Sequence, residues 1–146
     1  MTTIHKPIPI PDEQSAPFFE GARRGELMLL RCWECGTFMW PGAPFATSIR
    51  TRCINCFAGN LEWAPSAGLG ALFTYALMHQ VFDPAFADEV PYNVSIVELD
   101  EGARVTTNIV DCPNDELHIG MPVQALFVDA GDGIVIPKFR RRASQE

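Results

Sequence analysis

Two short motifs decide the fold of this chain: Cys32-Trp33-Glu34-Cys35-Gly36 and Cys53-Ile54-Asn55-Cys56. Each contains a Cys-x2-Cys pair, and the 17 residues 36–52 separate the two pairs. Two residues between cysteines allow a tight turn, or knuckle, whose sulfurs both point inward, and two neighbouring knuckles can surround one metal ion. Gly36 supplies the backbone freedom that such a turn favours. The spacing therefore predicts a four-cysteine zinc ribbon whose ligands are Cys32, Cys35, Cys53 and Cys56.

Zinc suits this ligand set because four thiolates close a tetrahedral site and leave no position for water or substrate. Iron of the rubredoxin type uses the same ligands and is the main alternative occupant. The second knuckle continues with Phe57, where a redox rubredoxin would have glycine, and this favours zinc. Two disulfides would need an oxidising compartment, and a thioredoxin-like pair would need a βαβ context. We therefore expect a structural metal that stabilises a segment too short to build its own core.

The segments around the ribbon predict short regular elements. Residues 12–24 predict a helix, with candidate caps Asp12 and Ser15 at its start and Arg23 and Arg24 before Gly25 at its end. Residues 26–31 predict a strand that enters the first knuckle. Residues 61–63 predict a strand that leaves the second.

From residue 68 onward the pattern is wholly β, with Gly, Pro, Asn and Asp at the turns. Five short strands with an irregular break near residues 112–120 are typical of a small closed barrel of the OB type. The expected strands are 69–82, 91–99, 103–111, 122–129 and 133–139. The chain thus predicts a mainly β protein with four parts: an arm and short helix at 1–25, a zinc ribbon at 26–66, a five-stranded OB-fold barrel at 67–140 and a tail at 141–146.

The composition narrows the class of protein. The chain has 146 residues and a formal net charge of −7, which argues against a nucleic-acid partner because phosphate contacts require a basic surface. No apolar run approaches the roughly 20 residues that cross a bilayer, so no membrane partner is expected. The N-terminal residues 1–7 lack the apolar core of a secretory signal, and the paired cysteines suit a reducing compartment. We expect a cytoplasmic protein.

No recognisable catalytic motif accompanies the ribbon. His5 lies in the proline-rich arm, His79 falls on an expected barrel strand, and His118 is expected to be exposed. Cys112 follows Asp111 in an expected turn, where a loop or packing thiol is the simpler interpretation than a reactive nucleophile. We therefore expect no catalytic residues and no enzymatic activity from the chain alone.

Three aromatic residues, Phe38, Trp40 and Phe45, lie between the knuckles, where a ribbon offers little core to receive them. Exposed aromatic side chains on a rigid scaffold would form a partner-binding surface. The alternative is that they pack against Phe18 and Phe19 of the expected helix, or against the barrel. Both interpretations stay open from the sequence.

Further motifs flank the cysteines in a specific order over residues 12–140. They are Phe18-Phe19-Glu20-Gly21, Leu61-Glu62-Trp63, Pro91-Tyr92-Asn93-Val94, Ile119-Gly120-Met121-Pro122-Val123 and Ile136-Pro137-Lys138-Phe139. In this combination the chain resembles the family known as domain of unknown function 35, or DUF35, which joins a rubredoxin-like zinc ribbon to an OB-fold. The 17-residue spacer is longer than is usual in that family.

The resemblance implies an accessory subunit of thiolase-superfamily acyl-CoA enzymes, such as thiolases and lipid-transfer-type aldolases. Such a subunit would dock on the catalytic partner, form a hetero-oligomer and support binding of the CoA thioester. Lys138, Arg140 and Arg141 could then meet CoA phosphates. For these basic residues the alternative is a merely solubilising tail.

Two other functions compete with the accessory subunit. The first is a stand-alone acyl-CoA-binding protein. The second is a single-stranded nucleic-acid-binding OB protein, since OB-folds serve that role. The net charge of −7 counts against the second.

Overall fold

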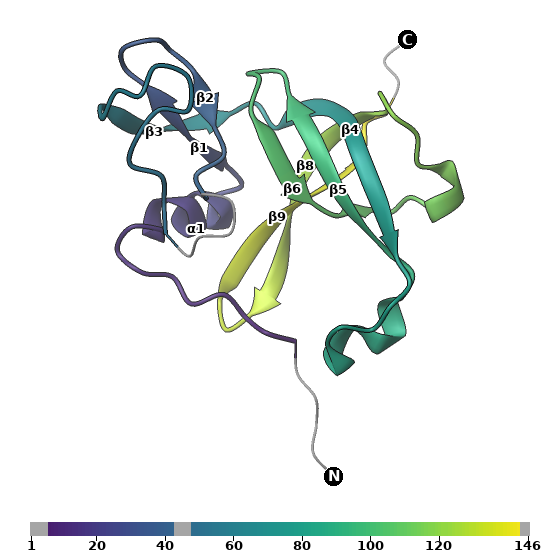
Figure 1. Cartoon of the computed structure of the whole chain (residues 1–146). Coiled ribbons are helices and arrows are strands. Elements are labelled where there is room, and N and C mark those ends of the chain that lie inside the picture. Colours follow the sequence, from purple (N-terminus) through teal and green to yellow (C-terminus); the bar gives the residue numbers. More distant parts are fainter. Residues whose placement is uncertain (1–5, 43–47, 144–146) are drawn as a thin grey trace.

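The computed structural model describes residues 6–42 and 48–143. A short helix and a three-stranded sheet form the N-terminal half, and a six-stranded sheet forms the C-terminal half (Figure 1). The elements are α1 (Ala16–Arg23), β1 (Leu27–Cys32), β2 (Phe38–Met39), β3 (Leu61–Ser66), β4 (Leu69–Met78), the 3-10 helix η1 (Pro84–Glu89), β5 (Tyr92–Leu99), β6 (Arg104–Thr107), β7 (Ile109–Val110), the 3-10 helix η2 (Asn114–Glu116), β8 (Pro122–Gly131) and β9 (Ile134–Arg141). The expected mainly β fold with a short N-terminal helix is confirmed.

Helix α1 is shorter than the sequence predicted, because it begins at Ala16 and not at residue 12. Asp12 and Ser15 form a turn before it: each backbone N–H donates to the other's side-chain oxygen, at 2.9 and 2.8 Å. These side chains therefore satisfy each other's backbone and do not cap the helix. Pro17 occupies the first turn, where its missing N–H costs no hydrogen bond.

The N-terminal sheet has the order β2-β1-β3, with β1 antiparallel to both neighbours. Strand β1 alternates strictly between two apolar clusters, as a strand with a side-chain period of two requires. Leu27 and Leu29 lie in the core of the six-stranded sheet, whereas Leu30 and Cys32 lie in a smaller cluster with Met39 and Cys53. One strand therefore links the barrel core to the cysteines.

The C-terminal sheet has the order β6-β5-β4-β8-β9-β7 and differs from the expected five-stranded closed barrel. The expected strand 103–111 is divided at Asn108: β6 pairs antiparallel with β5, and β7 pairs parallel with β9. The two edge strands of the sheet are thus consecutive in the chain and are joined by one residue. The sheet is not closed by a continuous ladder, but it curves back on itself as an OB-fold does.

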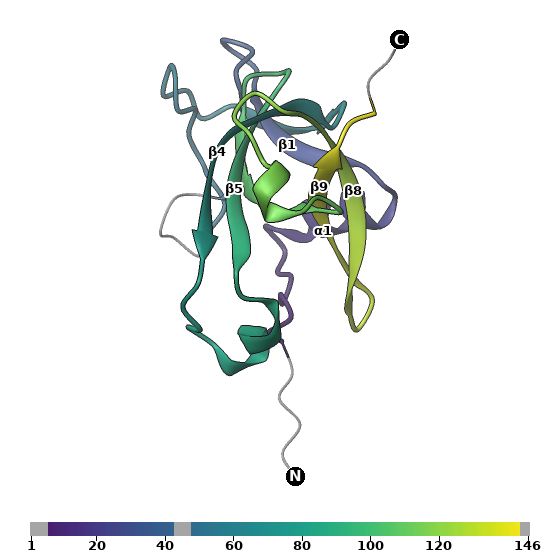
Figure 2. The same cartoon turned by 90° about the vertical axis from the view of Figure 1, so that its right-hand side faces the viewer.

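The irregular segment expected near residues 112–120 contains η2, and in Figure 2 it lies between the β4–β5 and β8–β9 sides of the barrel. Leu117 from this segment is buried in the core, and its carbonyl accepts a hydrogen bond from the Tyr75 hydroxyl at 3.1 Å. The interior of the barrel is filled by side chains such as Val97, Val123 and Phe139, all fully buried.

The arm before α1 contacts the barrel. Lys6 pairs with Glu89 of η1 at 2.6 Å, and its ammonium lies 5.6 Å from the centre of the Phe86 ring. Ile8 lies beside Gly131 at the β8–β9 turn. The expected extended arm therefore contacts two separate parts of the barrel.

A buried asparagine holds the chain where it changes partner at Asn108. The Asn93 side-chain oxygen accepts from the Ile109 N–H (2.7 Å) and from the Ser95 hydroxyl (2.7 Å). Its amide group donates to the Ile109 carbonyl at 2.8 Å. The Asn93 side chain thus replaces the strand partner that Ile109 loses when the chain leaves β5.

Asn93→Ala should lower the free energy of unfolding by about 2–4 kcal/mol, because it leaves the buried N–H and carbonyl of Ile109 without partners. Ser95→Ala removes only one hydrogen bond from the same network and should cost about 1 kcal/mol. Urea denaturation of both variants measures the difference. Equal, small effects would contradict the bridging role of Asn93.

Candidate metal centre

The four predicted cysteine ligands come together in one cluster. The sulfurs of Cys32, Cys35, Cys53 and Cys56 all lie within 4.8 Å of one another. Cys32 lies 3.6 Å from Cys56, and Cys35 lies 3.5 Å from Cys53, measured between sulfurs. Four thiolates at the usual zinc–sulfur distance of about 2.3 Å form a tetrahedron with edges of about 3.8 Å. The cluster therefore fits a tetrahedral metal ion without rearrangement of the chain.

Local backbone bonds fold each half of the cluster into the expected knuckle. In the first, the Gly36 N–H donates to the Cys32 carbonyl at 2.9 Å. In the second, the Phe57 N–H donates to the Cys53 carbonyl at 3.2 Å. The Asn55 N–H also points at the Cys53 sulfur, at 3.3 Å, as expected of a turn built around a thiolate.

Within each knuckle the first cysteine is buried and the second is exposed, and the thiols differ in acidity. Cys32 and Cys53 are buried, whereas Cys35 and Cys56 are exposed. The Thr37 hydroxyl, 3.1 Å away, lowers the pKa of the Cys35 thiol to about 6. At Cys56 the Ala58 N–H lowers the pKa, but partial desolvation of the sulfur and the three other sulfurs outweigh it and raise the pKa to about 12. Four such close sulfurs ionise together only when a cation balances them.

Four protein ligands leave a tetrahedral ion no open position for a substrate. Zn²⁺ and iron both accept this donor set, so the geometry fits a metal ion and leaves its identity open. At this site a metal ion would crosslink β1, the second knuckle and, through them, β3.

Phe38 and Trp40 are half-buried and pack against the body of the molecule. Both contact the main core, and Trp40 meets the Phe18 ring edge-on, with centroids 5.3 Å apart. The Arg31 guanidinium lies 5.6 Å from the centre of the Phe38 ring. Of the two alternatives, the structure shows Phe38 and Trp40 packed against the helix and the barrel. Their role as partner contacts stays a prediction. Phe45 lies outside the described residues.

Other large apolar side chains of the ribbon are exposed and were not among the predicted contact residues. They are Trp33, Ile54 and Phe57. The signal was present in the motifs: when both sulfurs of a knuckle point inward, the residues between and directly after them must face outward.

The predicted basic residues lie on β9 but in different surroundings. Lys138 is half-buried. The exposed Arg140 donates to the side-chain oxygen of Gln124 at 3.0 and 3.1 Å when that amide is oriented toward it. Arg141 pairs with Glu116 at 3.4 Å. A carboxylate therefore balances the charge of Arg141, whereas a neutral amide holds Arg140.

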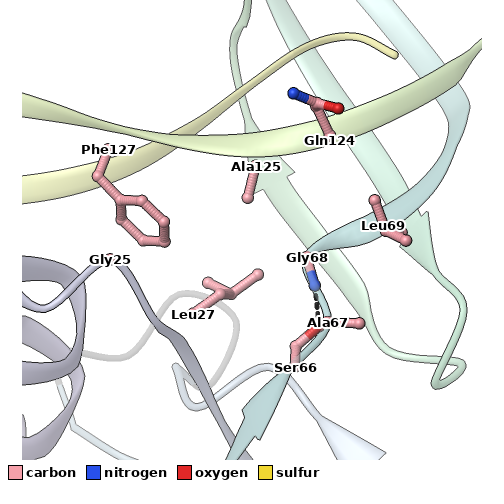
Figure 3. Close-up of a pocket in the computed structure, with 9 residues that line it drawn as sticks. All are labelled: Gly25, Leu27, Ser66, Ala67, Gly68, Leu69, Gln124, Ala125 and Phe127. Atoms are coloured by element: carbon pink, nitrogen blue, oxygen red, sulfur yellow. Dashed lines mark hydrogen bonds between the residues drawn. The ribbon is translucent and has the colours of Figure 1, made fainter. Parts of the chain in front are cut away.

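A pocket of about 230 Å³ lies where the ribbon meets the barrel (Figure 3). Leu27, Ala125 and Phe127 form its apolar walls, and the chain from Ser66 to Leu69 borders it. Gln124, which accepts from Arg140, also borders the pocket, but its side chain points away from the other lining side chains (Figure 3). The structure does not bring the basic residues and the pocket into one site.

The remaining candidates lie apart from the cysteine cluster. His79 is exposed and follows β4, which ends at Met78; the prediction that it lies on a barrel strand is wrong because the strand is shorter than its pattern. His118 is exposed, as expected, and His5 lies outside the described residues. Burial raises the pKa of the Cys112 thiol, whose S–H donates to the Pro113 carbonyl at 3.5 Å.

The fold and the cysteine cluster together define a class: a four-cysteine ribbon, able to hold a metal ion, followed by an OB-fold. Residues 63–128 match the family model described as "ChsH2, C-terminal OB-fold domain". A "DUF35 domain-containing scaffold protein" of Methanocaldococcus jannaschii is 34% identical over 113 residues, which cover 75% of each chain. This chain belongs to the DUF35 family.

Two further similarities extend over nearly the whole chain. A solved structure named "Ltp2-ChsH2(DUF35) aldolase" contains a chain that is 32% identical, with a TM-score of 0.73, covering 92% of this chain and 98% of that one. A "Probable enoyl-CoA hydratase alpha subunit" of Thermomonospora curvata is 35% identical over 143 residues. This chain spans about two fifths of that relative's length, since the match covers 97% of this chain but 41% of the relative.

Within residues 6–42 and 48–143, no helix is long and apolar enough to cross a membrane.

Replacing one buried ligand should abolish metal binding. Cys53→Ser should reduce the metal content from about one ion per chain to near zero and destabilise the ribbon by several kcal/mol, because structural zinc supplies about 10–16 kcal/mol in small domains. Cys112→Ser, which alters the one cysteine outside the cluster, should leave the metal in place. Elemental analysis and thermal denaturation measure both effects. Metal retained in full by the Cys53 variant would contradict the four-ligand site.

Proposed function

We propose that this chain is a non-catalytic accessory subunit that docks on a thiolase-superfamily enzyme and supports its activity on a CoA thioester. The observation that carries the proposal is the match over 92% of this chain to the DUF35 chain of the Ltp2-ChsH2 aldolase. The scaffold and subunit names of the other relatives support it. The hydratase name belongs to a protein more than twice as long, so it supports a role in acyl-CoA chemistry but not hydration by this chain.

The metal in this proposal is zinc with a structural role. A d¹⁰ ion held by four thiolates has no redox chemistry and no open coordination position. Its contribution would be to fix the knuckles and, through β1, the position of the ribbon on the barrel core. Zinc in the elemental analysis supports this assignment, whereas iron and visible absorption would contradict it.

The proposed contact with CoA uses the basic end of β9. The five residues 138–142 contain one lysine and three arginines on a chain with a net charge of −7, so they are a local site of opposite charge to the body. Of the two exposed arginines, Arg140 is held by a neutral amide, whereas Arg141 pairs with the carboxylate of Glu116. A phosphate of CoA could replace or join that amide at little cost, because guanidinium groups bind phosphate through two parallel hydrogen bonds.

Co-expression with the thiolase-superfamily proteins of the source organism tests the docking proposal. One of them should co-purify with this chain, and its activity on acyl-CoA should fall at least tenfold without it. The matched control is the Cys53→Ser variant, in which the proposed scaffold is damaged but the barrel sequence is unchanged. A partner that keeps full activity alone would contradict the proposal.

Removing the Arg140 side chain should weaken CoA binding by the complex. Arg140→Ala should raise the dissociation constant for a CoA thioester about tenfold, because a charge-assisted hydrogen bond is worth about 1.5–3 kcal/mol. Arg141→Ala should have a smaller effect, since Glu116 already neutralises that side chain. Isothermal titration of the complex and of the isolated chain measures both. Tight binding by the isolated chain would instead favour the stand-alone acyl-CoA-binding protein.

A further inference from the structure

The two knuckles carry exposed apolar side chains that the fold does not use. Trp33 is 68% exposed, Ile54 is 57% exposed and Phe57 is 74% exposed. Trp33 belongs to the first knuckle, and the other two belong to the second. We refer to these three residues as the knuckle patch.

The knuckle patch surrounds a single centre. Both knuckles hold sulfurs of the same cluster, all within 4.8 Å of one another. The Trp33 N–H also donates to the Asn60 carbonyl at 2.9 Å, which brings the first knuckle against the turn that follows Phe57. The turns of the ribbon lie at the upper left of Figure 1, away from α1 and from the β8–β9 hairpin. The three side chains therefore border one exposed end of the molecule.

Phe57 occupies a position that glycine would fill at lower cost. Its φ is 68°, in the left-handed region that disfavours side chains with a Cβ. In the first knuckle the equivalent residue is Gly36, with a φ of 77° and the same hydrogen bond to the first cysteine of its pair. The Phe57 ring is largely exposed, so packing does not offset the strain. A strained, exposed aromatic residue is a sign of function rather than of folding.

The size and charge of the knuckle patch fit a protein partner. Large apolar side chains present about 150–250 Å² when free, so at these exposures the three offer on the order of 400 Å². That is about half of the roughly 800 Å² per partner in a stable interface. Arg52 lies beside the patch, its guanidinium 3.2 Å from the Phe57 carbonyl, and within the described part of the chain it forms no salt bridge. An apolar pocket with an acidic rim would complement both features.

We propose that the knuckle patch is the surface on which the catalytic subunit docks, with Trp33 and Phe57 as apolar anchors and Arg52 meeting a carboxylate of the partner. This inference rests on the proposed accessory function and names the face of the molecule that performs it. The metal then has a second role, because it fixes the two anchors relative to each other before the partner arrives. Preorganised aromatic anchors of this kind dominate the energetics of protein interfaces.

Phe57→Gly separates docking from folding. The variant should keep about one metal ion per chain and have a higher thermal midpoint than the wild type, because glycine relieves the left-handed strain. Its affinity for the thiolase-superfamily subunit that co-purifies with the wild type should nevertheless fall at least tenfold. Trp33→Ser should also lose affinity with its metal retained. Ile119→Ser, an exposed apolar residue on the barrel, is the matched control and should bind normally.

Calorimetry of the purified pairs gives the affinities, and elemental analysis gives the metal content. If the wild type forms a complex and the Phe57 and Trp33 variants bind with unchanged affinity, the knuckle patch is not the docking surface. The accessory function would still stand. Loss of metal from Phe57→Gly would show that Phe57 serves folding of the ribbon and not docking. Wild-type self-association that Phe57→Gly abolishes would assign the patch to a second copy of this chain. Absence of any wild-type complex with thiolase-superfamily proteins would instead contradict the accessory function itself.

Discussion

The two faces of strand β1 are the constraint on which the rest of the structure depends. Leu27 and Leu29 enter the core of the barrel, and Leu30 and Cys32 enter the metal cluster. Because side chains alternate along a strand, the register that buries the leucines also sets the position of the first ligand. A shift of one residue would bury Met28 in the barrel and turn Cys32 away from the other sulfurs. The ribbon and the barrel are therefore positioned by the same six residues.

The features set by local spacing could be predicted from the sequence. Two Cys-x2-Cys pairs at this spacing favour closure around a common centre, and Gly36 has the left-handed backbone that its place in the knuckle favours. The strands were visible as alternating apolar residues between turn signals. The whole of β8 and β9, for example, lies within two residues of the predicted limits. These are consequences of neighbours along the chain, which a single sequence contains.

The features that depend on distant residues could not be predicted. The break at Asn108 is visible only when β7 is seen beside β9, because Ala103, Val105 and Ile109 keep the period-two spacing of a single strand across it. Asp12 and Ser15 look like helix caps but bond to each other. A ribbon alone offers little core to the aromatic residues of the spacer, whereas Trp40 packs on Phe18 of the helix. In each case the deciding contact joins segments that the sequence pattern treats separately.

The single residue between β6 and β7 has a consequence for aggregation. An open sheet presents two edges whose unpaired backbone groups can recruit strands from other molecules. Here the two edge strands are consecutive in the chain and short, since β6 has 4 residues and β7 has 2, and very short edge strands offer little for another strand to pair with. The longest strand edge left in the ribbon is β3, which contains Pro65 and the charged Glu62. Both residue types discourage strand addition, so the geometry that shapes the barrel also protects the protein from edge-to-edge association.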